Sequence, residues 1–198
     1  MGFLKKLFKN SEQKKEILNK LVFQDSGILT NFVESKDNYF LAVGKEMGGK
    51  DSVALIKDNK MLWKNKFDNI VHFALSTDNS YCVIVTQLQK KEMPTGYRSG
   101  GHIYLINKEG KIKDIKIPCD GLSCSISPDC KNLGVITMGP EWGVYYFDNK
   151  GKILWKKRFD SRIGGIEILK DYIQIYDKMH KETRKEIMRL NNNGEIEK

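Results

Sequence analysis

The sequence predicts an all-β fold built from four repeats of four short strands, and three observations support this prediction. Similar text recurs along the 198 residues at steps of 51, 41 and 43 residues, counted from Asn59 to Gly110, Gly151 and Gly194. Each copy breaks at short polar turns, and apolar residues alternate with polar ones beside them. A repeat of about 40–50 residues is typical of arrays of supersecondary units.

The first recurrent element is a hairpin. Its four copies are "SVALIKDNKMLWKNKFD" from Ser52, "GHIYLINKEGKIKDIKIP" from Gly101, "GVYYFDNKGKILWKKRFD" from Gly143 and "EIMRLNNNGEIEK" from Glu186. The turn carries Gly in three copies and Asn59 in the first. Gly and Asn tolerate the positive φ that a tight hairpin requires. Trp63 and Trp155 follow at equivalent places, so we expect both to pack between repeats rather than to bind a ligand.

The second recurrent element lies between these hairpins. It reads "TNFVESKDNYFLAVG", "HFALSTDNSYCVIVT", "LSCSISPDCKNLGVIT" and "GIEILKDYIQIYD". In the third copy Leu122, Cys124 and Ile126 alternate with serines, which is the period of a half-buried strand. The Ser, Pro, Asp and Asn residues in the middle favour a turn. The repeats therefore contain four strands each and span residues 27–67, 69–118, 121–159 and 163–198.

The turns "STDNSY" and "SPDCKN", followed by "YYFDNKGKILW", resemble those of the quinoprotein-like and WD-repeat β-propellers. The resemblance covers most of residues 27–198 and implies a small β-propeller of about four four-stranded blades. Three arrangements stay open: a closed four-blade ring, which we favour, a half-ring capped by the N-terminal arm, or a half-ring that dimerises to eight blades. Quinone cofactors in the resembling enzymes typically lie beside a vicinal cysteine pair, which this chain lacks, so we expect no cofactor.

Residues 1–22 form a basic amphipathic N-terminal arm, and residues 23–198 form the predicted repeat domain. Phe3, Leu4, Leu7 and Phe8 share one helical stripe, and the stripe resumes at Ile17. We expect a short helix packed on the propeller. Contact of residues 2–9 with a membrane surface is the alternative, because lysines flank the stripe.

Composition excludes several classes of protein. The net charge of +9 is weak evidence for an anionic partner, but no nucleic-acid-binding motif accompanies it, so nucleic acid is not expected. No apolar run approaches the roughly 20 residues that cross a membrane, and no signal peptide is evident, which favours a cytoplasmic protein. The cysteines, none of them in a C-x-x-C pair, are expected to be free thiols without a metal site: Cys82, Cys119, Cys124 and Cys130.

The candidate site lies in the loops between the second and third strands of each repeat, here called the b–c loops. These are residues 44–52, 87–101, 138–143 and 177–185, and each contains a methionine. In a propeller they emerge on one face, and the longest loop is among them. Aromatic residues, Arg and Met are frequent at protein interfaces. The predicted partner-binding residues are Met47, Met93, Tyr97, Arg98, Glu141, Trp142 and His180. Trp142 has an alternative role as a core residue at the narrow end.

Two functions follow from these observations. The first is a non-enzymatic interaction module that binds a protein partner through the b–c loop face, with a homodimer as one possible assembly. The second is a propeller-based hydrolase or lyase with Arg98, Glu92, Glu141 and His180 at the channel mouth. No H-E-x-x-H or G-x-S-x-G motif supports the enzyme, and we predict neither catalytic nor metal-binding residues. His72 is expected to be a satisfied core or channel residue.

Overall fold

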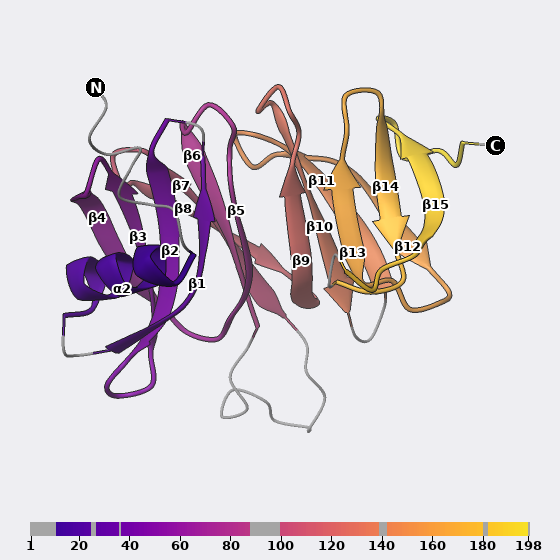
Figure 1. Ribbon diagram of the computed structural model, residues 1–198. Coiled ribbons are helices and arrows are strands. Elements are labelled where there is room, and N and C mark those ends of the chain that lie inside the picture. Colours follow the sequence, from indigo (N-terminus) through magenta and orange to yellow (C-terminus); the bar gives the residue numbers. More distant parts are fainter. Residues whose placement is uncertain are drawn as a thin grey trace. The chain divides into compact units, whose positions relative to one another are not determined.

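The computed structural model describes residues 11–24, 27–35, 37–87, 100–138, 142–179 and 182–197. The chain forms two compact units, residues 1–67 and residues 68–198, and each is considered on its own (Figure 1). The division predicted at residue 22 stays a prediction.

The described residues of the first unit form one helix and one antiparallel sheet of order β1-β2-β3-β4. Its elements are α2 (Ser11–Val22), β1 (Gly27–Glu34), β2 (Tyr39–Glu46), β3 (Asp51–Lys57) and β4 (Lys60–Phe67). The turn between β3 and β4 has positive φ at both Asp58 (48°) and Asn59 (61°), as a two-residue hairpin requires.

Helix α2 packs on one face of this sheet. Leu18, Val22 and Phe23 are buried together with the inward side chains of β2 and β3, namely Phe40, Ala42, Ala54 and Ile56. Phe23, just beyond the helix, fits because Gly27 and Gly44 lie against it: a Cβ added at Gly44 would lie 2.4 Å from the Phe23 ring. The expected docking of a helix is therefore confirmed for residues 11–22, whereas residues 2–9 lie outside the described residues.

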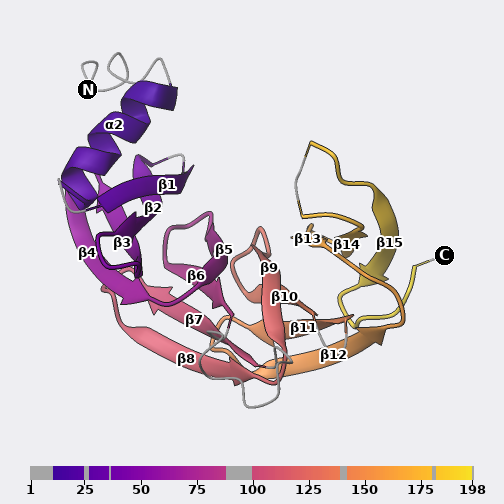
Figure 2. The same cartoon turned by 90° about the horizontal axis from the view of Figure 1, so that it is seen from below.

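The second unit contains three antiparallel sheets at the predicted repeats. They are β5 (Ile70–Leu75), β6 (Tyr81–Thr86), β7 (Gly101–Asn107) and β8 (Ile112–Ile117); β9 (Asp120–Ile126), β10 (Asn132–Met138), β11 (Trp142–Asp148) and β12 (Ile153–Phe159); and β13 (Gly165–Ile168), β14 (Tyr172–Tyr176) and β15 (Glu186–Asn191). Within this unit the first strands lie on the inner side and β8 and β12 on the outer side (Figure 2). The predicted strand "EIEK" is a single bridge between Leu190 and Ile196, so the last sheet has three strands in the described residues.

The predicted Gly turns use the same hydrogen bonds in all three copies of the second unit. Gly110, Gly151 and Gly194 have φ of 80°, 77° and 81°. The residue three positions before each glycine accepts its backbone N–H, and the side-chain oxygen of that same residue accepts two further backbone N–H groups. The accepting residues are Asn107, Asp148 and Asn191, with side-chain bonds of 2.8–3.2 Å. Asp148 and Gly151 thus form an ordinary hairpin, as predicted.

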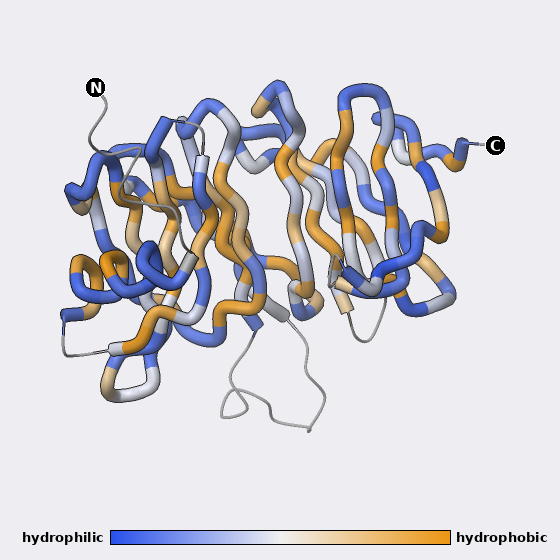
Figure 3. Tube along the Cα trace, viewed as in Figure 1, coloured by the Kyte–Doolittle hydropathy of each residue, from blue (hydrophilic) through white to orange (hydrophobic). Residues whose placement is uncertain are grey.

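The core of the second unit lies between its sheets. One cluster joins Val83, Val85 and Ile103 to Leu133, Val135 and Phe147, and a second joins Val144 and Tyr146 to Ile166, Ile173 and Ile175. Apolar residues accordingly follow the strands, while the turns are polar (Figure 3). Burying such apolar surface stabilises the fold by about 25 cal/mol per Å².

The packing role predicted for Trp155 is confirmed by its contacts, and that of Trp63 stays a prediction. Trp63 on β4 lies opposite Leu55 on β3, and Trp155 on β12 lies opposite Tyr146 on β11. The Trp155 ring stacks on Tyr146 with centroids 4.8 Å apart, and its Nε1 donates to the Asn192 carbonyl 2.9 Å away. Trp155 therefore joins the third sheet to the turn of the fourth.

The last sheet has one apolar and one polar face. Ile173 and Ile175 face the third sheet, and the alternate residues carry a hydrogen-bonded network on the other face. In this network the Tyr176 hydroxyl lies 2.6 Å from the Gln174 side-chain oxygen, to which it donates, and 3.1 Å from a Glu167 carboxylate oxygen. Arg184 pairs with Glu167 and lies 3.7 Å from the centre of the Tyr176 ring.

Candidate functional site

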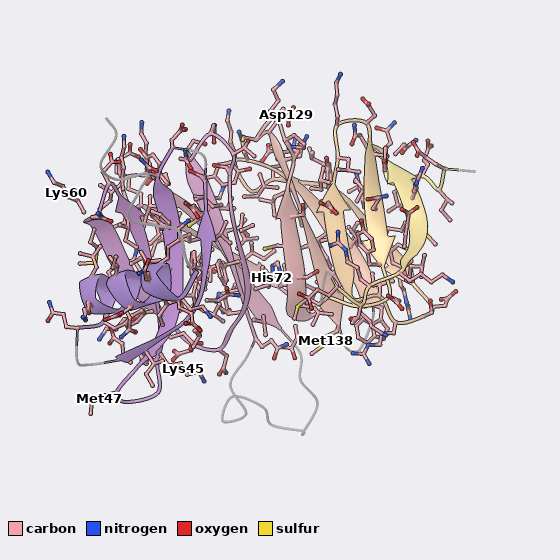
Figure 4. All side chains as sticks on the ribbon, viewed as in Figure 1. Lys45, Met47, Lys60, His72, Asp129 and Met138 are labelled. Carbon is pink, nitrogen blue, oxygen red and sulfur yellow. The ribbon has the colours of Figure 1, made fainter. Side chains whose placement is uncertain are left out.

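The second unit has two ends, and the b–c loops leave from one of them. At the third sheet this end is marked by Met138, where β10 ends, and the opposite end by Asp129 in the β9–β10 turn (Figure 4). The connections from β8 to β9 and from β12 to β13 lie at the Met138 end too, because antiparallel strands alternate in direction. This end of the second unit is called the b–c end below.

A pocket of about 280 Å³ opens at the b–c end of the third sheet. Its lining includes two aromatic side chains, one threonine and three cations, which are Trp142, Tyr145, Thr137, Lys156, Lys157 and Arg158. Buried Cys119, just after β8, and Gly143 complete it.

Register explains why these residues meet. Gly143 on β11 lies opposite Thr137 on β10 and opposite Arg158 on β12, and Tyr145 lies opposite Lys156. A Cβ on Gly143 would lie 3.1 Å from the Lys157 carbonyl oxygen and 3.4 Å from the Thr137 hydroxyl. Glycine at position 143 therefore allows these neighbouring groups to approach β11 closely.

Trp142 has the core role that the sequence left open, and its role in partner binding stays a prediction. It is partly buried and packs against the cluster that contains Val144, Phe159 and Ile163, so it contributes to the core. It also lines the pocket, and the Arg162 guanidinium lies 5.7 Å from the centre of its ring. An aromatic ring held by the core on one side and by a cation nearby is a preorganised contact surface.

The charge beside the pocket is positive. Residues 156–162 contain Lys156, Lys157, Arg158 and Arg162 against one acid, Asp160. Within the described part of the chain, neither lysine nor Arg162 forms an ion pair with a carboxylate. The sequence does not distinguish these cations as candidate site residues, because lysines recur on the outer strands β4, β8 and β12, where they also protect sheet edges from pairing.

A larger depression of about 490 Å³ lies at the opposite end, between the third and fourth sheets. Several of its polar groups are already hydrogen-bonded within the protein. Ser127 donates to Asp129 (2.7 Å) and accepts the Asn132 N–H (2.9 Å), and the Asn192 carbonyl accepts from Trp155. Hydrogen bonds to Ser127 and to the Lys131 N–H lower the pKa of Asp129, so this carboxylate serves the turn.

His72 is a satisfied residue of an inner strand, as predicted. Its Nδ1 accepts the Cys124 backbone N–H at 3.2 Å and lies 3.3 Å from the Cys124 sulfur. Burial raises the pKa of the Cys124 thiol, and also that of Cys82, well above the usual value. Both thiols are therefore protonated and unreactive at neutral pH.

The structure describes two of the seven predicted partner-binding residues. Trp142 lines the pocket, and Met47 is 81% exposed in the β2–β3 turn of the first unit. The other five lie outside the described residues: Met93, Tyr97, Arg98, Glu141 and His180. Partner binding at the b–c end therefore stays a prediction. Trp142 is the predicted residue that also lines the pocket.

Two absences concern the described residues. No group of three or more His, Cys, Asp or Glu side chains there is placed to hold a metal ion. None of the helices described is long and apolar enough to span a bilayer.

Comparisons with known proteins place the fold but not the family. No protein-family model matches the chain, and no curated protein matches it. Among solved structures, it is similar to the β-propeller domain of Cps50 (Swd1) from Myceliophteria thermophila, with 10% identity and a TM-score of 0.54 over 76% of this chain and 50% of that one. BamB from Moraxella catarrhalis has 13% identity and a TM-score of 0.54, over 86% of this chain and 50% of that one.

A Pyrococcus horikoshii acylaminoacyl peptidase has a TM-score of 0.61 at 9% identity, over 86% of this chain and 32% of the peptidase. The chain therefore spans between a third and a half of the length of these three structures. The fold is that of a β-propeller, and the described residues form four antiparallel sheets, three with four strands and one with three, together with one helix near the N-terminus. At these identities the likeness shows the fold alone.

Proposed function

We propose that this chain is a β-propeller interaction module that binds a protein partner through the b–c end of its second unit. The observation that carries the proposal is the pocket at this end, with Trp142 fixed by the core and open to the pocket.

The composition of the pocket supports a macromolecular partner. Trp, Tyr and Arg are enriched among the residues that dominate binding energy at interfaces, and the pocket contains Trp142, Tyr145 and Arg158. Its volume, about 280 Å³, lies at the lower limit of pockets that enclose a small molecule. It fits one side chain of a partner better than a whole cofactor.

Site-specific photo-crosslinking tests this function. A benzoylphenylalanine placed at Trp142 keeps an aromatic ring in the site, and the same residue placed at Lys131 probes the opposite end. We expect, in the native host, a discrete cross-linked protein from position 142 and none from position 131. The cross-linked protein, once purified, should bind the wild-type chain, and Trp142→Ala should weaken binding about tenfold or more. Equal cross-linking from both positions, or none from position 142, would contradict the proposal.

No reaction is proposed for the chain. The candidate groups of the hydrolase or lyase hypothesis, Arg98, Glu92, Glu141 and His180, lie outside the described residues. The similarity to an acylaminoacyl peptidase concerns the fold and covers a third of that protein.

A further inference from the structure

The larger depression, at the end of the second unit opposite the b–c end, is of a size that suits a small molecule. Its volume of about 490 Å³ lies within the range of pockets that enclose such ligands. It is bounded by the turn between β9 and β10, by the turn between β13 and β14, and by Asn192 in the turn after β15. The third and fourth sheets therefore both contribute to it.

The most informative group in this depression is the hydroxyl of Tyr146. The Tyr146 side chain lines the depression, is 2% exposed and stacks on Trp155. Its hydroxyl forms no hydrogen bond within the described residues. Burial, with a smaller contribution from the Asp129 carboxylate, raises the pKa of Tyr146 to about 12, so the hydroxyl is protonated and can both donate and accept. Buried polar groups are nearly always hydrogen-bonded, so this one favours a ligand that bonds to it.

Strand register directs Asn132 toward the same depression. Tyr146 on β11 lies opposite Gly134 on β10, and a Cβ added at Gly134 would lie 2.6 Å from the side chain of Ile166 on β13. Asn132 is two residues before Gly134 on the same strand, so its side chain leaves the same face, toward the fourth sheet. Tyr146 and Asn132 therefore reach the depression from one face of the third sheet.

Several polar side chains around the depression have no hydrogen bond or ion pair within the described residues. Among them are Asn132, Asp171 and Asn192. Asn192 bonds only through its backbone carbonyl, which accepts the Trp155 indole N–H, and Asn132 bonds only through its backbone groups. A carboxamide both donates and accepts, and a carboxylate accepts. The depression therefore offers a ligand several donors and acceptors at once.

The charges around the depression are balanced, unlike those beside the pocket at the b–c end. The Asp129 carboxylate lies 3.8 Å from the Lys131 ammonium group, and Lys170 precedes Asp171 in the β13–β14 turn. No excess of either sign is present to select an ion. The lining also contains three apolar side chains, which are Pro128, Ile168 and Leu169.

We propose that this depression binds a neutral sugar, whose hydroxyl groups bond to Tyr146, Asn132 and Asn192 and whose C–H groups pack on Ile168 and Leu169. A sugar hydroxyl both donates and accepts, as do the tyrosine hydroxyl and the two carboxamides, and an uncharged ligand suits the balanced charge. The inference concerns a second site, at the other end of the unit, and goes beyond the proposed function.

The indole N–H signals of the full chain report binding at this site. The chain has three tryptophans, and Trp155 is joined to the depression through Tyr146 and the Asn192 carbonyl. Proton–nitrogen correlation NMR spectra, assigned with Trp142→Phe and Trp155→Phe, follow titrations with methyl glucoside, methyl galactoside, methyl mannoside and N-acetylglucosamine. We expect at least one of these sugars to shift the Trp155 signal, with half saturation at about 1–10 mM, and to leave the Trp142 signal in place.

Matched variants locate the site. Tyr146→Phe removes the hydroxyl but keeps the ring on Trp155, so the chain should stay folded by circular dichroism and bind the sugar about fivefold more weakly. Asn192→Ala should weaken binding to a similar extent. Asn193→Ala, at the next position in the same turn but outside the lining, should leave binding unchanged. Equal losses in the Asn192 and Asn193 variants, or full binding by Tyr146→Phe, would overturn the inference.

Charged and planar relatives of the sugars test the class of ligand. Glucosamine carries a cation, glucuronate carries an anion, and adenosine carries a planar base. Tighter binding of any of these three than of every neutral sugar would overturn the inference, and so would a Trp155 signal that none of the four sugars shifts. The proposed function is tested separately, by cross-linking from position 142, so either conclusion can fail while the other stands.

Discussion

The first and last sheets of this chain differ in how one face of each avoids exposing apolar surface to water. The first sheet has an apolar face that α2 covers, with Leu18, Val22 and Phe23 buried against it. The last sheet buries apolar residues on the face toward the third sheet, and its other face carries Glu167, Tyr176 and Arg184 in a hydrogen-bonded network. A helix buries the apolar face of the first sheet, whereas the exposed face of the last sheet carries polar groups that bond to one another.

This difference has a physical consequence. A repeat array is stable when each apolar face meets a neighbour, and its terminal repeats need a polar or covered outer face. Removing the helix from the first sheet would expose Phe40 and Ile56 to water, whereas a change in the polar face of the last sheet would expose little new apolar surface. The stability of the first sheet should therefore be far more sensitive to substitutions in the helix that covers it than the stability of the last sheet is to changes in its polar face.

The largest expected effect follows from Phe23→Ala. Phe23 is fully buried between the helix and the sheet, so truncation should lower the free energy of unfolding by about 3–5 kcal/mol, measured by urea denaturation of the full chain. Lys15→Ala, on the exposed side of α2, should change it by less than about 0.5 kcal/mol. Equal effects of the two variants would show that the helix does not stabilise the sheet.

A smaller effect is expected at the last sheet. Arg184 and Glu167 have side chains 15% and 34% exposed, so Arg184→Ala should cost about 1–2 kcal/mol, since it leaves the Glu167 carboxylate without its cation. A double-mutant cycle with Glu167→Gln should give a coupling energy of about 1 kcal/mol. Strictly additive losses would mean that the pair contributes nothing to this face.

The first unit should also lose stability in acid through Glu46. Hydrogen bonds from Lys64 and Lys66 lower the pKa of this carboxyl from 4.5 to about 2. Because the folded-state pKa is the lower one, the stabilisation is present above pH 4.5 and is lost as the pH falls toward 2.

Glu46→Gln should therefore destabilise the chain by about 1 kcal/mol at pH 7, and the difference from wild type should shrink toward zero in acid. Denaturation curves of both proteins between pH 7 and pH 2 measure it. A difference that stays constant over this range would show that the two lysines do not hold the carboxylate in the folded state.

The smallest effect is expected on the solvent side of the helix. Lys20 and Glu16 form an ion pair of 2.9 Å, but both side chains are mostly exposed. Lys20→Ala should leave the denaturation midpoint unchanged within error, since exposed pairs are screened by water and salt. A clear loss would mean that the outer side of α2 contacts more than solvent.

Much of the fold follows from local rules that the sequence contains. Gly110, Gly151 and Gly194 mark the same turn because only a residue that tolerates positive φ can close it, and the Asn or Asp three positions before each one bonds the turn. The stripe at Ile17 and Leu18 likewise predicts a helix with one apolar side. These features depend on a few neighbouring residues, so one sequence suffices.

The pocket depends on register between strands, and one sequence does not give register. Trp142 was predicted from its residue type, but Lys156 and Arg158 become neighbours of Tyr145 and Gly143 only through the pairing of β11 with β12. Cys119 joins them from the connection after β8, which is distant in sequence. In the sequence, Lys156 and Arg158 are visible as part of a basic stretch after Trp155, and a basic stretch is equally typical of a protected edge strand.

The most direct test of the comparison is the mass in solution of three full-length proteins, measured by sedimentation velocity with circular dichroism as the check on folding. We predict that the wild-type chain sediments as a monomer of 22.8 kDa, that Leu18→Glu with Val22→Glu retains its β spectrum and self-associates through the uncovered face of the first sheet, and that Glu167→Ala with Arg184→Ala stays monomeric. A wild-type dimer, or association of the last-sheet variant while the helix variant stays monomeric, would contradict the account.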